Sequence, residues 1–70
     1  MNLKEIKIST EFIKLDAFLK WCAIASSGGE ARIYIYDELV KVNGEVCIQR
    51  GKKIRVTDVV SFDGEDYKII

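Results

Sequence analysis

The residues of this sequence best suited to chemistry are a serine, two glycines and a glutamate at positions 27–30. Ser27 followed three residues later by Glu30 has the spacing of a capping box, in which each side chain bonds a free backbone N–H group. The pattern therefore predicts the start of a helix. N–H groups at such a start lack helical partners and carry partial positive charge. Because Gly28 and Gly29 have no Cβ, a phosphate group can approach these N–H groups closely.

A run of basic residues is suited to the same anion. Residues 50–55 hold four positive charges and no acid, although the whole chain balances eleven Lys and Arg against eleven Asp and Glu. Segregated charge gives even a neutral protein a basic face. We expect the helix start and the basic run to converge on nucleic-acid phosphates. The candidate contacts are Lys14, Ser27, Gly28, Gly29, Arg32, Lys41, Arg50, Lys52, Lys53 and Arg55.

Two interpretations of residues 50–55 stay open at this point. The run either binds phosphates, which makes affinity depend on salt, or it is a solvated edge strand whose charges prevent aggregation. Tyr36 is also open to two interpretations, since an exposed tyrosine either stacks on an unpaired base or has no special role.

Enzymatic and metal chemistry are not expected. The chain has no histidine, so it lacks the usual general base and a common metal ligand. Cys22 and Cys47 lie far apart and form no zinc-binding pair, and nothing predicts a disulfide between them. No run of apolar residues is long enough to span a membrane. We expect a cytoplasmic monomer without cofactor or metal.

The elements that must position these residues include two helices. Leu15, Phe18 and Leu19 begin an apolar stripe that continues through Cys22 and Ala23, which predicts one amphipathic helix. The second helix is predicted from about Gly28 to Asp37, with Ala31, Tyr34 and Ile35 on its buried side. The connection between the helices is short, so they should lie close together.

Several strands surround these helices. Alternation at Ile6 and Ile8 predicts a first strand, and further strands are expected at 40–42, 46–48, 54–56, 59–62 and 67–70. Asn43-Gly44 and Asp63-Gly64 are the residue pairs of tight type I′ hairpins. We predict an α+β fold, with two short packed helices, similar to a helix-turn-helix, against a mostly antiparallel sheet of four to five strands. The last strand should lie beside the first.

The order of three motifs resembles the S-four (S4) domain, the alpha-L RNA-binding motif named for a ribosomal protein. The segments are Lys14-Leu15-Asp16-Ala17-Phe18-Leu19, then Ala25 to Arg32, then Val40-Lys41-Val42-Asn43-Gly44, at the spacings of that family. The likeness covers about Lys14 to Phe62 within a single domain at 1–70, and is greatest to short, stand-alone bacterial members.

The resemblance implies a non-catalytic protein that binds structured RNA. Ribosomal or transfer RNA would be held by the first turns of both helices and the adjoining loop, with a ribosomal subunit as a possible partner. Ribosome biogenesis or translation is the process that the family implies. Lys14, Ser27, Glu30 and Arg32 take the places of family residues, and Lys41 occupies a variable, often basic position.

The sequence also departs from the family pattern. Ala17 and Gly28-Gly29 replace basic residues, and Glu38 and Thr57 stand where glycines are common. The lost charge leaves an alternative function open, a protein-interaction adaptor with a weakened RNA face. Exposure of Trp21 and Ile33 as one apolar patch would favour that alternative.

Overall fold

The first helix, α1, is shorter than its apolar stripe predicted. The computed structural model describes residues 2–70 and places α1 at Leu15–Trp21. Leu15, Phe18 and Leu19 are fully buried, as predicted. The prediction that the stripe runs on through Ala23 is wrong, because the helix ends and Ala23 turns the chain with a φ of 60° and an exposed side chain. Cys22 is half-buried at this end.

The second helix, α2, spans Gly28–Tyr36 and begins at the predicted cap, Ser27. Ala31 and Ile35 are buried against the core. Tyr34 is half-buried and packs its ring 5.0 Å from that of Phe62. The buried side of the helix is therefore the one that the sequence predicted.

The main sheet has five strands in the order β1-β7-β6-β3-β4. The two strands nearest the ends of the chain, β1 (Asn2–Ile6) and β7 (Glu65–Ile69), are neighbours in the sheet and run parallel. The other neighbouring strands are antiparallel. The remaining members are β3 (Val40–Val42), β4 (Glu45–Val46) and β6 (Val59–Phe62). This arrangement confirms the prediction of a mostly antiparallel sheet, and the prediction that the last strand of the chain lies beside the first.

Both predicted hairpins are present. Asn43 and Gly44 have φ angles of 52° and 86°, and Asp63 and Gly64 have 51° and 78°. Positive φ at both central positions is the requirement of a type I′ turn, which matches the twist of the flanking strands.

A separate two-stranded sheet lies beside α1. Its strands are β2 (Ile13–Lys14) and β5 (Lys53–Ile54), paired antiparallel. The sequence did not predict β2, and the prediction of a strand over residues 54–56 is wrong, because β5 ends at Ile54. Ile54 is fully buried.

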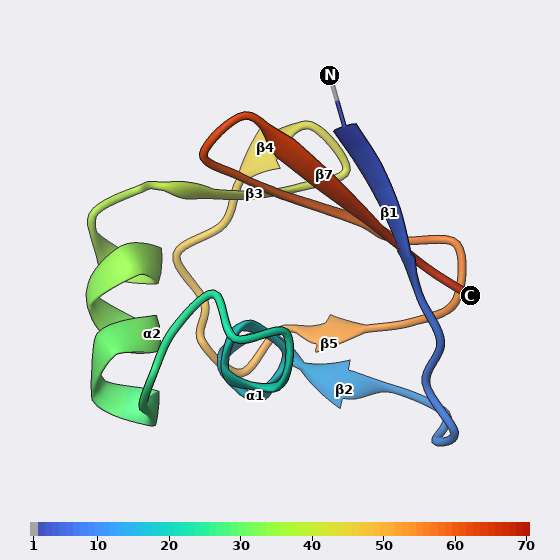
Figure 1. Ribbon diagram of the computed structural model, residues 1–70. Coiled ribbons are helices and arrows are strands. Elements are labelled where there is room, and N and C mark those ends of the chain that lie inside the picture. The colour runs from blue at the N-terminus through green and yellow to red at the C-terminus, as the bar shows by residue number, and fades with distance from the viewer. Residues whose placement is uncertain (1) are drawn as a thin grey trace.

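The helices lie on one side of the main sheet, as Figure 1 shows. Between the two layers Phe18 of α1 meets Tyr67 of β7 edge to face, with ring centroids 6.2 Å apart. The buried core consists of Ile8, Leu15, Phe18, Leu19, Ala25, Ala31, Ile35, Val40, Val42, Ile54, Val60, Tyr67 and Ile69.

Candidate functional site

The start of α1 gathers basic residues from two parts of the chain. Lys14 and Lys53 lie directly opposite each other in the β2–β5 pair. The N–H groups of Leu15 and Asp16 donate to the carbonyls of Lys52 (2.9 Å) and Arg50 (3.0 Å), so the loop is held against the first turn of the helix. These bonds bring Lys14 to the basic run. We call Lys14, Arg50, Lys52, Lys53 and Arg55 the basic cluster.

An aromatic ring lies under this cluster. The Nζ of Lys53 is 4.9 Å from the ring centroid of Phe12, and the Cζ of Arg55 is 5.8 Å from it. Cations are attracted to the face of an aromatic ring at such distances. Phe12 thus helps to position two of the five basic side chains. No sequence pattern indicated this role, because Phe12 belongs to no recognisable element.

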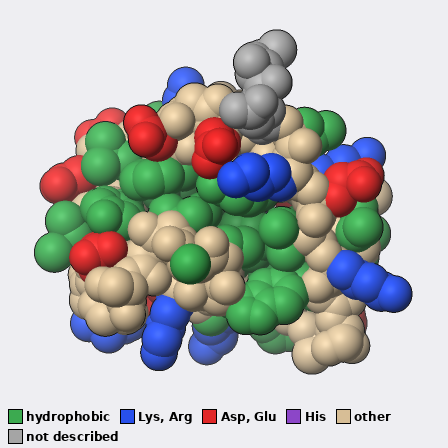
Figure 2. Space-filling model, in the orientation of Figure 1, with side chains coloured by type: hydrophobic (Ala, Val, Ile, Leu, Met, Phe, Trp, Pro, Cys, Tyr) green, Lys and Arg blue, Asp and Glu red, His purple; other side chains and the backbone are tan. Residues whose placement is uncertain are grey.

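The side chains of the basic cluster form no ion pair with an acid in the described residues. All five residues are exposed. Within residues 2–70 the only ion pair joins Lys4 to Glu65, at 3.5 Å, and involves none of them. The carboxylate of Asp16 lies nearby in sequence and accepts from the N–H of Ala17 (2.8 Å). Figure 2 shows Lys and Arg side chains along the lower edge of one face, below the helices.

Asp58 fixes the backbone at one end of the basic cluster. Its Oδ2 accepts from the N–H of Arg55 (2.9 Å), and its Oδ1 accepts from the Nδ2 of Asn43 (3.1 Å). The Oδ1 of Asn43 in turn accepts from the N–H of Val59 (2.9 Å). Asn43 therefore ties the β3–β4 hairpin to the loop that carries Arg55, which is a structural role.

The start of α2 carries the predicted cap in a modified form. Ser27 Oγ accepts from the N–H of Glu30 (3.2 Å), as a capping box requires. The Glu30 carboxylate reaches one residue beyond the cap, where it accepts from the N–H (3.1 Å) and hydroxyl (3.2 Å) of Ser26. Tyr34 also donates its hydroxyl to Glu30 (3.0 Å). The bond from the Ser26 N–H, followed by that from Tyr34, lowers the pKa of Glu30.

The two glycines at this helix start leave their backbone accessible. No acceptor for the N–H of Gly28 or Gly29 is found in the described part of the chain. An added Cβ at Gly28 would meet nothing within 4 Å, and one at Gly29 would lie 3.8 Å from Ser27 Oγ. Arg32 and Tyr36 follow Gly28 at four-residue steps and are exposed, so the three lie on one strip of α2.

Lys41 lies elsewhere, and the expectation that it converges with the other basic residues is wrong. Val40 and Val42 point into the core beside the helices, so Lys41 between them points to the opposite face of the sheet. There it pairs in register with Ser61, which hydrogen-bonds Asp66 at 2.6 Å. The alternation of side chains along β3 separates Lys41 from the basic cluster.

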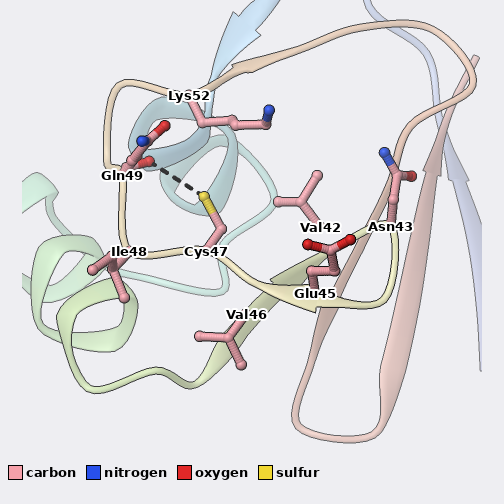
Figure 3. Close-up of a pocket in the computed structure, with 8 residues that line it drawn as sticks. All are labelled: Val42, Asn43, Glu45, Val46, Cys47, Ile48, Gln49 and Lys52. Carbon is pink, nitrogen blue, oxygen red and sulfur yellow. Dashed lines mark hydrogen bonds between the residues drawn. The ribbon is translucent and has the colours of Figure 1, made fainter.

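A groove beside the basic cluster runs along the β3–β4 hairpin and the following loop (Figure 3). Lys52 and Gln49 line one end of it, and the thiol of Cys47 donates to the carbonyl of Gln49 at 3.8 Å. Both cysteines are free, and burial raises the pKa of the Cys22 thiol. Residues 2–70 contain no group of three side chains arranged to hold a metal ion. No helix of this part is long and apolar enough to cross a membrane.

Comparison with known proteins found a matching family model and a matching relative. The model of the S4 domain family matches residues 6–70. A probable ribosome maturation protein, RlbA of Bacillus subtilis (strain 168), is 42% identical over 59 residues, covering 84% of this chain and 83% of that protein.

Two solved structures share the fold. YbcJ from E. coli, described as having an αL motif involved in RNA binding, matches 100% of this chain and 90% of its own, with 28% identity and a TM-score of 0.73. The 30S ribosomal protein S4e from Thermoplasma acidophilum matches with a TM-score of 0.71 and 21% identity over 86% of this chain. This chain corresponds to 32% of that ribosomal protein.

Proposed function

The chain belongs to the S4 domain family, and from this premise we propose that it binds structured RNA without catalysing a reaction. The RNA is ribosomal and the process is ribosome maturation. The relative named for that process supports this choice over transfer RNA, because it aligns along most of both chains. YbcJ, whose fold extends over the whole of this chain, supports RNA as the ligand.

The observation that carries the proposal is the placement of Lys14 opposite Lys53. Like charges directly opposite in a sheet are destabilising. Lys14 also occupies the N-cap of α1, where its side chain makes no capping bond and where Ser, Thr, Asp or Asn is preferred. Lys14 therefore departs from two rules of local stability, the pairing of unlike charges and the preference for a capping side chain. Such departures are expected where a residue serves a function. A polyanion would relieve the repulsion.

We assign the strip of Gly28, Arg32 and Tyr36 on α2, together with the adjacent Gly29, to the same RNA. Its two unpartnered N–H groups suit a phosphate, and the Glu30 carboxylate is held by Ser26 instead of covering them. Ser27 serves this surface indirectly, because its hydroxyl fixes the helix start.

The adaptor alternative is favoured by one observation. Trp21 is 56% exposed and Ile33 is 58% exposed, as a protein-binding surface would require. They lie on different helices, however, whereas the basic residues gather at the start of α1. Basic residues clustered on one face are typical of RNA-binding proteins.

The proposal is tested by measuring affinity for ribosomal RNA fragments across a range of salt concentrations. Changing Lys52 and Lys53 together to Gln should flatten the slope of log K against log[salt] by about 2 units, since each phosphate contact contributes about one. The matched control is Lys41→Gln with Lys68→Gln, which removes two lysines from the outer face of the sheet and should leave the slope unchanged. Equal slopes for both double variants would refute the basic cluster as the RNA site. Tighter binding to transfer RNA would refute the choice of ribosomal RNA.

A further inference from the structure

An apolar groove lies on the side of α1 that faces the N-terminal segment. It is lined by Ile8, Ser9, Thr10, Ile13, Ala17 and Trp21. Ile8 is buried and Ile13 half-buried, so they form its floor, and the Trp21 ring is left 56% exposed beside them. A large exposed aromatic ring next to an apolar groove is a surface that a second flat ring can cover.

The groove shares one side of α1 with Lys14, a member of the basic cluster. Lys14 is the N-cap of α1 and faces Lys53 across the β2–β5 pair. Lys14, Ala17 and Trp21 are three and then four residues apart, so they lie along one side of α1. At about 1.5 Å per residue, Lys14 and Trp21 are separated by roughly 10 Å along the helix. The small side chain of Ala17 keeps the space between them open.

We propose that this groove receives an unpaired base of the RNA, which stacks on Trp21 while its backbone phosphate lies at Lys14 and Lys53. Charge selects this occupant, because Lys14 lies at the end of the same side of α1 and forms no ion pair within residues 2–70, so it attracts a polyanion. Single-stranded positions are where proteins read RNA by stacking bases on aromatic side chains. The inference rests on the proposed RNA binding and adds that the bound RNA has an unpaired nucleotide at the end of a duplex or in a bulge.

Trp21 is the only tryptophan of the chain, so its fluorescence reports on this groove directly. The probes are a labelled RNA hairpin with one unpaired nucleotide and the same hairpin fully paired. We expect both to bind, the first more tightly by on the order of tenfold. The hairpin with the unpaired nucleotide should quench Trp21 emission and protect the ring from acrylamide.

Variants separate this inference from RNA binding itself. Trp21→Ala should abolish the preference for the unpaired nucleotide and leave affinity for the paired hairpin unchanged, while Trp21→Phe should keep part of the preference. Ile33→Ala, which removes an equally exposed apolar side chain from α2, is the matched control and should keep all of it. Thermal unfolding shows that each variant is folded.

Three results would overturn the inference. Equal affinity for the two hairpins with unchanged Trp21 emission would leave RNA binding intact and assign the groove to a protein partner. Loss of affinity for both hairpins in Trp21→Ala would make Trp21 a general contact. Binding of neither hairpin, nor of ribosomal RNA fragments, by the unaltered protein would refute the proposed function and this inference with it.

Discussion

Lys14 and Lys53 face each other across the two-stranded β2–β5 sheet, and neither forms an ion pair within residues 2–70. The pairing follows from backbone bonds that hold the 50–52 loop against the first turn of α1. The repulsion is partly offset for Lys53, because its ammonium lies over the ring of Phe12. Lys14 has no such contact in the described residues. Lys14 is therefore the position where stability and RNA binding should conflict most clearly.

Replacing Lys14 by Ser should stabilise the fold and weaken RNA binding. Serine removes the repulsion with Lys53 and supplies a capping hydroxyl at the start of α1, together worth about 1 kcal/mol. Urea unfolding measures the gain, and RNA titration measures the loss. Lys14→Gln, which removes the charge without adding a cap, should show the same loss of affinity with a smaller gain. A stabilised variant with unchanged affinity would mean that Lys14 does not contact RNA.

Acids at the start of α2 should exclude RNA from it. Gly28→Asp with Gly29→Asp should keep the fold, because both positions have room for a side chain and acids are tolerated in a first helical turn. We expect at least about a tenfold loss of RNA affinity, from repulsion between carboxylates and phosphates. The control is the neutral pair Gly28→Asn with Gly29→Asn. If both variants bind equally well, this helix start is a structural cap only.

The cap of α2 should make the stability of the folded protein depend on pH in the acid range. Hydrogen bonds from Ser26 and Tyr34 lower the pKa of Glu30 below its ordinary value of 4.5. A carboxyl group whose pKa is lowered by folding stabilises the folded state above the ordinary pKa and loses that effect as the pH falls through the lowered value. Between pH 6 and pH 3, the unaltered protein should therefore lose more stability than Glu30→Gln. Urea unfolding at each pH measures the difference, and parallel curves would contradict it.

Glu38 and Thr57, where the resemblance to the family leads one to expect glycine, adopt backbone angles that glycine tolerates best. Glu38 and Thr57 have φ angles of 63° and 81°. Left-handed conformations cost roughly 1–2 kcal/mol for residues other than glycine, and a β-branched residue is especially unfavourable there. Thr57→Gly should therefore raise the free energy of unfolding by about 1 kcal/mol, and Glu38→Gly by less. Gly51→Ala, outside the left-handed region, is the opposite comparison: there alanine should stabilise the fold, because it restricts the unfolded chain. A lower stability of Thr57→Gly would show that its side chain makes a compensating contact.

The sequence by itself determined the features that depend on near neighbours in the chain. The stripe of Leu15, Phe18 and Leu19, the Ser27 cap and the Asn43-Gly44 turn each follow from spacings of four residues or fewer. Burial, capping bonds and positive φ angles act at this range, so residue types alone indicate them. The three ordered motifs then indicated the family.

Tertiary structure alone decided which basic residues share a surface. The β2–β5 pair is two residues long on each side, too short to show a period, and it forms because the 50–52 loop bonds to the start of α1. That contact placed Lys14 beside Lys53 and brought Phe12 under both Lys53 and Arg55. Lys41 was separated from them because only the packing of the helices determines which face of the sheet is outside. Long-range contacts of this kind leave no local pattern in the sequence, so only the tertiary structure shows which basic residues form one surface.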